Sequence, residues 1–273
     1  MKKILIFILT ITLFTSNLLA QRGWEAGGGL GVSNYFGDLN TTFSVMRPGL
    51  AATVAARFNF NDRICLKMSG NYGTISADDK DSKNIYERRR NLHFKSMIVD
   101  GTAQLEFNFL PYNYFDRTQR FSPYLFLGLN VFNFNPKAQY EGKWYNLRPL
   151  GTEGQFRGEE YYTTQMGVAY GGGVKIALNE EWSINVELSA RKLFTDYLDD
   201  VSKVYPNMND LRKANGAIAV SLSDPSIPDA EGRKIGQLGR QRGDKKDNDM
   251  NTFLTVSLLY YFGDLKCPPI SNR

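Results

Sequence analysis

Strict alternation of apolar and polar residues is the feature of this sequence that most limits its fold. Between residues 100 and 109, every second residue is polar or charged, and the residues between them are small or apolar. A period of two residues is typical of a β-strand, whereas an amphipathic helix repeats every 3.6 residues. The stretches 182–189 and 254–262 alternate in the same way. Five further candidate strands cover about 24–35, 49–60, 63–75, 123–134 and 164–178.

The connections between these eight segments alternate in length. Residues 61–62 and 179–181 are tight turns, and 111–122 is a moderate one. Short turns at one end and long polar loops at the other are typical of outer-membrane barrels. We therefore predict an all-β protein, an eight-stranded antiparallel transmembrane β-barrel with short periplasmic turns and long extracellular loops. The long loops cover about 36–47, 76–95, 135–162 and 196–250.

The position of the charges distinguishes this barrel from a soluble one, which would bury its apolar face. If the polar face lines the lumen, four acidic and four basic side chains lie inside, too many for the core of a soluble barrel. The opposite face carries no charge over the central turns of the strands, as contact with lipid requires. The predicted lumen charges are Glu25, Arg57, Lys67, Asp100, Glu106, Lys175, Glu187 and Arg191.

Aromatic residues with lipid-facing parity gather at the strand ends next to the short turns. Such a ring at one height is typical of a membrane–water interface. Ordinary core aromatics of a β-sandwich would not collect at one end of successive strands. The predicted girdle comprises Trp24, Phe58, Phe60, Phe107, Phe109, Trp182, Tyr260 and Phe262.

Residues 1–20 have the layout of a secretory signal peptide: Lys2 and Lys3, then an apolar run, then Ala20. The run is too short to cross a bilayer, which needs roughly 20 apolar residues. We expect the barrel to span residues 21–263, with a periplasmic tail at 264–273, in the outer membrane of a Gram-negative bacterium. Without the leader, 31 basic residues face 28 acidic ones, which gives no support for nucleic-acid binding.

An eight-stranded barrel encloses a lumen that side chains can fill. Charges of both signs fall at similar depth in the half next to the short turns. We therefore predict a structural network of ion pairs across the lumen and a barrel that conducts no ions. The network residues are Glu25, Arg57, Lys67, Glu106, Lys175 and Glu187.

One histidine and two cysteines leave few arrangements for catalysis or metal binding. His93 and Ser96 are an odd number of residues apart, so they face opposite sides of a strand and cannot act together. The glycine runs at 27–31 and 171–173 lack the helix that a nucleotide-binding fingerprint needs. We expect no enzymatic activity, no cofactor, no metal and no small-molecule substrate.

Charged loop clusters suggest two interpretations. The acidic residues could bind calcium, but neither cluster follows the EF-hand spacing. Solvated loop charge is the favoured interpretation, and it applies also to the basic run at 88–90. The acidic clusters are Asp78, Asp79 and Asp81, and Asp196, Asp199 and Asp200.

The two cysteines are both expected at the periplasmic end. By parity, Cys65 points into the lumen, and Cys267 follows the last strand by five residues. Five extended residues reach about 16 Å, and the periplasm oxidises thiols. One hypothesis is a Cys65–Cys267 disulfide that ties the tail over the mouth of the barrel. Two free thiols are the alternative.

Several sequence motifs carry information beyond the alternation, and the loop motifs are the most specific of them. They read GGGLGVSNYFGDLN at 27–40, RPG at 47–49, AQLEFNFLPY at 103–112, FNFNPKA at 132–138, GKWYNLRPLGTEGQ at 142–155, FTDYLDDVS at 194–202 and CPP at 267–269. Together they resemble PorG, a family of outer-membrane barrels of the type IX secretion system. The resemblance covers almost the whole chain after the leader, apart from about 206–250.

The resemblance implies a non-enzymatic scaffold that anchors a periplasmic ring of a PorK-like lipoprotein and a PorN-like protein. A free-standing surface barrel or adhesin, acting through its long loops, is the alternative. The turn at 111–122 is the largest on the periplasmic side, and interfaces favour its combination of aromatics and Arg. Anchoring at the membrane interface is an equally good interpretation of its aromatic residues. The candidate contact residues are Tyr112, Tyr114, Phe115, Arg117 and Arg120.

Overall fold

A computed structural model describes residues 23–42, 44–156 and 158–263 of the chain. The predicted leader and tail lie outside these residues. The strands are β1 (Gly23–Phe36), β2 (Gly49–Asn59), β3 (Ile64–Asp78), β4 (His93–Asn108), β5 (Phe121–Tyr140), β6 (Lys143–Asn146), β7 (Thr164–Ala177), β8 (Trp182–Leu193) and β9 (Met250–Phe262). The helices are η1 (Asp79–Asp81), α2 (Ile85–Arg90), η2 (Arg117–Gln119), η3 (Arg148–Leu150) and α3 (Met208–Ser223). No helix among the described residues is long and apolar enough to cross a membrane.

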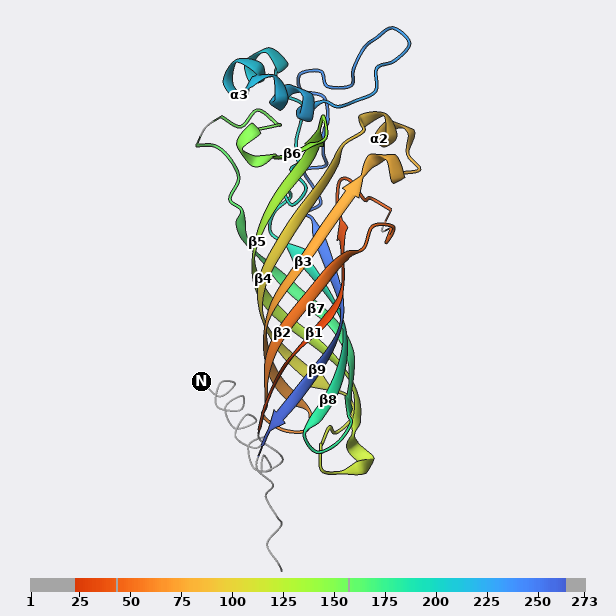
Figure 1. Cartoon of the computed structure of the whole chain (residues 1–273), viewed down its shortest axis with the longest axis vertical. Coiled ribbons are helices and arrows are strands. Elements are labelled where there is room, and N and C mark those ends of the chain that lie inside the picture. Colours follow the sequence, from red (N-terminus) through yellow and green to blue (C-terminus); the bar gives the residue numbers. More distant parts are fainter. Residues whose placement is uncertain (1–22, 43, 157, 264–273) are drawn as a thin grey trace, which may run out of the picture.

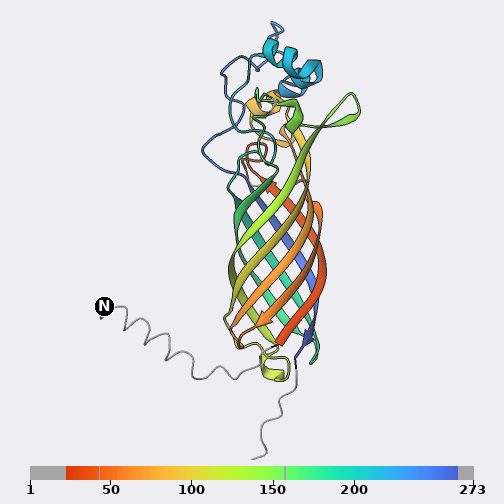
Figure 2. The same ribbon diagram turned by 90° about the vertical axis from the view of Figure 1, so that its left-hand side faces the viewer.

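Eight of the strands form a closed antiparallel barrel (Figures 1 and 2). Their order is β4-β3-β2-β1-β9-β8-β7-β5, and pairing of β4 with β5 closes the sheet. The remaining strand, β6, pairs only with the last residues of β5, at 137–140. The predicted fold class, an eight-stranded antiparallel barrel, is therefore confirmed, with β6 as a short addition to one hairpin.

The glycines of β1 allow a close approach to β9. A Cβ at Gly27 or Gly31 would collide with the backbone carbonyl of Leu258 or Leu254. Glycine in a strand commonly marks a place where a neighbouring backbone comes near. The glycine run therefore has a packing role, in agreement with the sequence-based rejection of a phosphate-binding loop.

Each of the longest strands changes polarity along its length. In the short-turn half of β4, Glu106 and Gln104 point inward and Leu105 points outward. Beyond Asp100 the inner face becomes apolar, with Ile98 and Phe94 buried, and beyond Met97 the outer face becomes polar, with Lys95 exposed. β3 and β5 change in the same way, at about residues 72–73 and 131–132. The barrel therefore has a polar lumen and apolar wall at one end, and an apolar core and polar wall at the other.

This change explains why several strands are longer than predicted. β4 begins at residue 93 instead of 100, and β5 ends at 140 instead of 134. β8 and β9 each extend four residues beyond their predicted limits, 189 and 254, toward the long loops. At the ends of the β4 and β5 extensions the phase is inverted, because Phe94 and Ala138 are buried inside and Lys95 and Lys137 are exposed outside. A search for a single apolar face therefore ends at the point of inversion.

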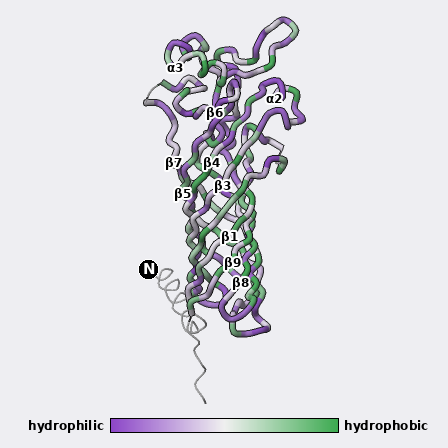
Figure 3. Tube along the Cα trace, viewed as in Figure 1, coloured by the Kyte–Doolittle hydropathy of each residue, from purple (hydrophilic) through white to green (hydrophobic). Residues whose placement is uncertain are grey.

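The long connections fold together into a structure that we call the cap, made of the described residues in 37–48, 79–92, 141–163 and 194–249 (Figure 1). It includes α2 and α3, which the sequence analysis does not predict. Asn84 caps α2 by accepting a hydrogen bond from the Tyr86 amide, and Asn207 caps α3 in the same manner. Polar residues prevail in the cap, while apolar residues follow the barrel strands (Figure 3).

Candidate functional site

The outer wall of the barrel is apolar over most of its height. Leu105 and Leu127 face each other across β4 and β5, and their side chains are 55% and 63% exposed. Charged residues on the outer face of the barrel strands occur only at the long-loop ends, within the part of the chain that is described. An apolar wall around a charged lumen is the arrangement of a barrel surrounded by lipid.

The aromatic residues of the predicted girdle lie next to the short turns, where their rings contact one another in groups. Trp24 in β1 lies opposite both Phe58 and Phe262. The rings of Trp24 and Phe58 are 5.1 Å apart, and those of Tyr260 and Phe262 are 4.8 Å apart. Most of these rings are exposed on the outer face. They mark the membrane interface on the short-turn side.

Glu106 is the centre of the charge network in the lumen. Its Oε2 atom lies 2.8 Å from Arg57 Nε and 2.7 Å from Lys175 Nζ. Arg57 also forms an ion pair of 2.8 Å with Glu25 and donates a hydrogen bond of 3.0 Å to Asn185. The side chains of Arg57, Glu25 and Glu106 are fully buried.

A second pair joins this network through an amide. Lys67 Nζ lies 2.7 Å from Glu187, which also accepts a hydrogen bond of 2.6 Å from the Tyr124 hydroxyl. The Gln104 amide donates to both Glu106 and Glu187, at 3.1 Å each. The structure thus brings together all six predicted network residues, three acidic and three basic, so their formal charges cancel.

A smaller group of charges lies nearer the cap. Arg191 forms an ion pair of 3.1 Å with Asp100, and its guanidinium lies 4.2 Å from the ring centre of Phe253. Asn71 and Asn130 donate further hydrogen bonds to Asp100, at 2.6 and 2.8 Å. This pair also cancels in charge, and it lies where the lumen changes from polar to apolar.

Cys65 points into the lumen, as its parity predicts, and is buried. Its sulfur accepts hydrogen bonds from Lys175 Nζ at 3.5 Å and from the Asn108 amide at 3.7 Å. Cys267 lies outside the described residues, so the disulfide between the two cysteines stays a prediction.

The turn between β4 and β5 closes the short-turn end of the barrel. Tyr114 is buried, stacks on Tyr261 with ring centres 4.7 Å apart, and donates a hydrogen bond of 2.8 Å to the Ser183 hydroxyl. Tyr112 is buried beside it, 5.3 Å from the Tyr114 ring. The prediction that Tyr112 and Tyr114 offer a partner contact is therefore wrong, because both rings fold back into the mouth.

The other candidate contact residues of this turn are accessible to different degrees. Phe115 is partly buried against Tyr261. Arg117 is exposed, and Arg120 is half-buried with its guanidinium near the Leu178 carbonyl. Only Arg117 among the five projects freely away from the barrel.

In the cap, most of the acidic residues that were expected to be solvated are buried, so this interpretation is wrong for them. Asp79 is fully buried and binds Arg90 through two contacts of 2.8 Å. Arg90 also donates to the carbonyls of Arg242 and Asp38, at 2.7 and 2.8 Å. The Arg90 guanidinium thus joins three of the loops that form the cap. In the sequence, the basic run at 88–90 gives no indication of these contacts.

The second acidic cluster forms the interior of the cap. Asp199 accepts a hydrogen bond of 2.5 Å from the Tyr35 hydroxyl, which also contacts Asp249 at 3.0 Å. Asp200 accepts a hydrogen bond of 2.8 Å from Tyr161, and Arg242 lies 3.9 Å away. Burial raises the pKa of Asp200 to about 6, although Arg242 opposes this shift. Burial and the nearby Asp249 raise the pKa of Asp199 well above its ordinary value.

Tyr35, Asp249 and Arg242 could not be recognised from the sequence as partners of these acids. Tyr35 and the acids do fall within two of the quoted motifs, GGGLGVSNYFGDLN and FTDYLDDVS. Asp249 and Arg242 belong to the stretch outside those motifs. These motifs were therefore the only sequence feature that pointed to some residues of the acidic cluster in the cap. No local pattern relates residues that are so distant in the chain.

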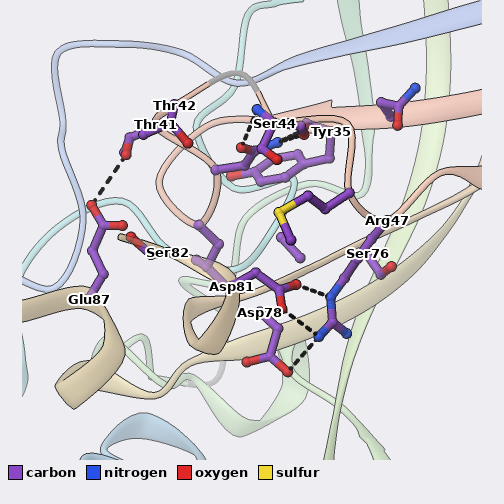
Figure 4. A pocket seen from close by; sticks show the side chains of 15 residues that line it. Tyr35, Thr41, Thr42, Ser44, Arg47, Ser76, Asp78, Asp81, Ser82 and Glu87 are labelled. Carbon is purple, nitrogen blue, oxygen red and sulfur yellow. Dashed lines mark hydrogen bonds and ion pairs between the residues drawn. The ribbon is translucent and has the colours of Figure 1, made fainter. Parts of the chain in front are cut away.

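A small polar cavity separates the first and second loops (Figure 4). Arg47 forms an ion pair of 3.4 Å with Asp78 and a hydrogen bond with Asp81, and Thr41 donates to Glu87 at 3.3 Å. The cavity volume is about 30 Å³, roughly the space of one water molecule. It is therefore a packing feature. In the described part of the chain, no group of three or more acidic, His or Cys side chains is placed to hold a metal ion.

The apolar wall, the girdle and the ion-paired lumen together define an integral membrane β-barrel of the outer-membrane class. The chain belongs to the family described as DUF6089, a domain of unknown function, whose model matches residues 2–217. No curated protein matches the chain.

Solved structures of small outer-membrane barrels are similar in fold. The attachment invasion locus protein Ail of Yersinia pestis is 10% identical, with a TM-score of 0.43, over 89% of this chain and 99% of that one. Neisserial surface protein A is 10% identical, with a TM-score of 0.44, over 88% and 97%. OprG of Pseudomonas aeruginosa is 11% identical, with a TM-score of 0.42, over 90% and 97%. At this level of similarity the comparison adds nothing about function.

Proposed function

We propose that the protein is a non-enzymatic scaffold of the type IX secretion machinery, which anchors a periplasmic ring of PorK-like and PorN-like proteins at the outer membrane. The observation that carries the proposal is the closed barrel interior. Six ion-paired side chains fill the lumen, and Tyr112 and Tyr114 close the mouth. A barrel with a filled lumen can contact partners outside the membrane only through its two ends. The motifs that resemble PorG indicate which partners those ends would bind.

A closed interior predicts that the purified protein conducts no steady ion current across planar bilayers. Within the described strands every lumen charge is paired, so none of these groups is free to line a water-filled path. A reproducible single-channel current would contradict the closed interior and would favour a transport function.

Arg117 is the candidate contact on the periplasmic side. It begins η2, which Asp116 caps by accepting a hydrogen bond of 2.9 Å from the Thr118 amide. The turn behind it is fixed by the Tyr114–Ser183 hydrogen bond. An exposed arginine on a fixed turn binds an acidic partner at a low entropic cost.

Co-purification from native membranes in mild detergent tests this proposal. We expect Arg117→Glu to reduce recovery of the ring proteins with the barrel. Arg212→Glu, an equal change of charge on an exposed residue of α3 at the opposite end, is the matched control and should not affect recovery. Equal recovery of the ring with both variants would show that this turn does not dock it.

The alternative, a free-standing surface barrel, is favoured by apolar side chains that the cap exposes. Ile85 in α2 and Leu238 in the last loop are 75% and 72% exposed. Exposed apolar residues on a folded surface often mark a binding site. If ring proteins never accompany the native barrel, while Ile85→Ser and Leu238→Ser abolish binding to an external surface, this alternative replaces the scaffold.

A further inference from the structure

Two lysines on the outer wall have no charged partner among the described residues. Lys95 in β4 and Lys137 in β5 are exposed, and the residues on both sides of each point into the barrel. Neither ammonium group forms an ion pair or a hydrogen bond with any residue that the structure describes. The other outward charges behave differently, since Asp78 pairs with Arg47 and Lys192 donates to a backbone carbonyl.

The two lysines are direct register partners. Lys95 lies opposite Lys137 in the antiparallel pair formed by β4 and β5. Side chains in such positions have Cβ atoms about 4.5–5.5 Å apart, and like charges there destabilise the sheet. The directly opposite positions on the neighbouring strands offer no carboxylate, because Ser76 faces Lys95 from β3 and Asn146 faces Lys137 from β6. The carboxylate diagonal to Lys95, that of Asp78, pairs with Arg47 instead. The repulsion is therefore not relieved within these strands.

Lys95 lies just beyond the last exposed apolar residue of β4, and on β5 Asn133 and Asn135 separate Lys137 from Val131 on the same outer face. Met97, two residues from Lys95 on the same face, is 49% exposed, and Val99 and Val131 continue the apolar surface. Two residues of a strand span about 7 Å. The change of polarity in β4 and β5 also falls between these apolar residues and the lysines. The ammonium groups are thus at the depth where lipid headgroups begin, on the side of the long loops.

We propose that Lys95 and Lys137 bind a phosphate group of a phosphorylated lipid in the outer leaflet. A phosphate between the two ammonium groups replaces their repulsion by two charge-assisted contacts. The acyl chains of the same lipid lie against Met97, Val99 and Val131. One lipid molecule therefore contacts both the apolar wall and the lysine pair. The inference is independent of the proposed role in secretion, because it concerns the opposite side of the membrane.

Unfolding of the full chain in bilayers of defined composition tests this assignment. The three compositions are neutral phosphatidylcholine, the same lipid with bis-phosphorylated lipid A, and the same lipid with dephosphorylated lipid A. The variant is Lys95→Gln with Lys137→Gln. The control is Lys245→Gln with Lys246→Gln, which removes the same charge from exposed residues of the cap.

We expect the effect of the variant to change sign with the lipid. In neutral bilayers the unfolding midpoint should rise, because the repulsion is gone. With phosphorylated lipid A the midpoint should fall relative to the unaltered protein, because the ligand no longer binds. Loss of about 1 kcal/mol per basic residue at an anionic lipid surface corresponds to roughly fivefold weaker binding for each lysine. The control should behave like the unaltered protein in every bilayer.

Three results would overturn the proposal. Equal stabilisation by dephosphorylated lipid A would mean that acyl chains alone are recognised. Equal stabilisation by inorganic phosphate in neutral bilayers would mean that the lysines take a free anion and not a lipid. A lower midpoint of the double variant in all three bilayers would mean that the lysines have only a structural role.

Discussion

Replacement of Glu106 by Gln should destabilise the barrel more than any other single loss of charge in the lumen network. Its Oε2 atom contacts Arg57 and Lys175 at 2.8 and 2.7 Å. After the substitution Arg57 keeps its ion pair with Glu25. Lys175 loses its carboxylate partner and keeps the Cys65 sulfur at 3.5 Å and the faces of the Tyr124 and Tyr112 rings at 4.7 and 5.9 Å. The variant therefore leaves one buried and unpaired ammonium group.

Removal of one partner from a buried ion pair costs about 3–5 kcal/mol. Because Arg57 stays paired, we expect a loss of unfolding free energy at the lower end of this range, about 3 kcal/mol. With a urea dependence of about 1–3 kcal/mol per molar, the unfolding midpoint should fall by roughly 1–3 M. The assay is a urea titration in detergent or vesicles, followed by the difference in gel mobility between folded and unfolded barrel.

A double variant isolates the interaction. Glu106→Gln combined with Lys175→Met removes both charges, so it should be more stable than Glu106→Gln alone. Glu180→Gln, the same chemical change on an exposed residue of a periplasmic turn, should alter the free energy of unfolding by less than about 0.5 kcal/mol. If the double variant loses as much as the sum of the two single variants, the lumen charges act independently and the network has no cooperative role.

Three further outcomes are expected. Leu127→Arg on the lipid-facing wall should lower the free energy of unfolding by about 2–4 kcal/mol. Asn133→Arg, on the same outer face but beyond the change of polarity, should lower it by at most about 1 kcal/mol. Equal losses for both variants in vesicle unfolding would contradict the proposed membrane boundary. Tyr114→Phe removes one buried hydrogen bond and should cost about 1 kcal/mol in a urea titration, whereas no change would mean that the mouth does not depend on it. Because burial raises the pKa of Asp200 to about 6, the folded cap holds this proton more tightly than the unfolded chain, and cap stability should fall as pH rises from about 4 through 6. Hydrogen exchange of residues 195–201 measures that decline, and Asp200→Asn should reduce it; the same pH profile in both proteins would exclude this carboxyl as the cause.

The part of the fold that lipid surrounds could be predicted from the sequence. There the environment is uniform, so Leu105, Leu127 and Val256 share one outward face and Glu106 and Lys175 share the other. Period and parity then determine which residues meet inside, and a narrow barrel leaves few ways to pair six charges. The register of β4 with β3 and β5 was not needed for that conclusion.

The cap could not be predicted in this way. Tyr35 of β1 meets Asp199 and Asp249 from opposite ends of the connection between β8 and β9, and no periodicity relates the three residues. Their isolated sequence contexts look like solvated polar loops. Tyr114 was misplaced for a related reason, because an aromatic residue in a turn has no strand partner that fixes its direction. Its burial depends on Tyr261 from the last strand, which only the closed barrel brings near.

The exchange of polarity along single strands fixes how deeply the protein is inserted. A displacement toward the cap would lift Leu105 and the girdle out of hydrocarbon, and the opposite displacement would immerse Asn133 and Lys95. Each movement is unfavourable on several strands at once, so the molecule has one height relative to the bilayer. The cap and Arg117 are consequently held at constant distances from the two membrane surfaces, which is the property that a fixed attachment point between two compartments requires.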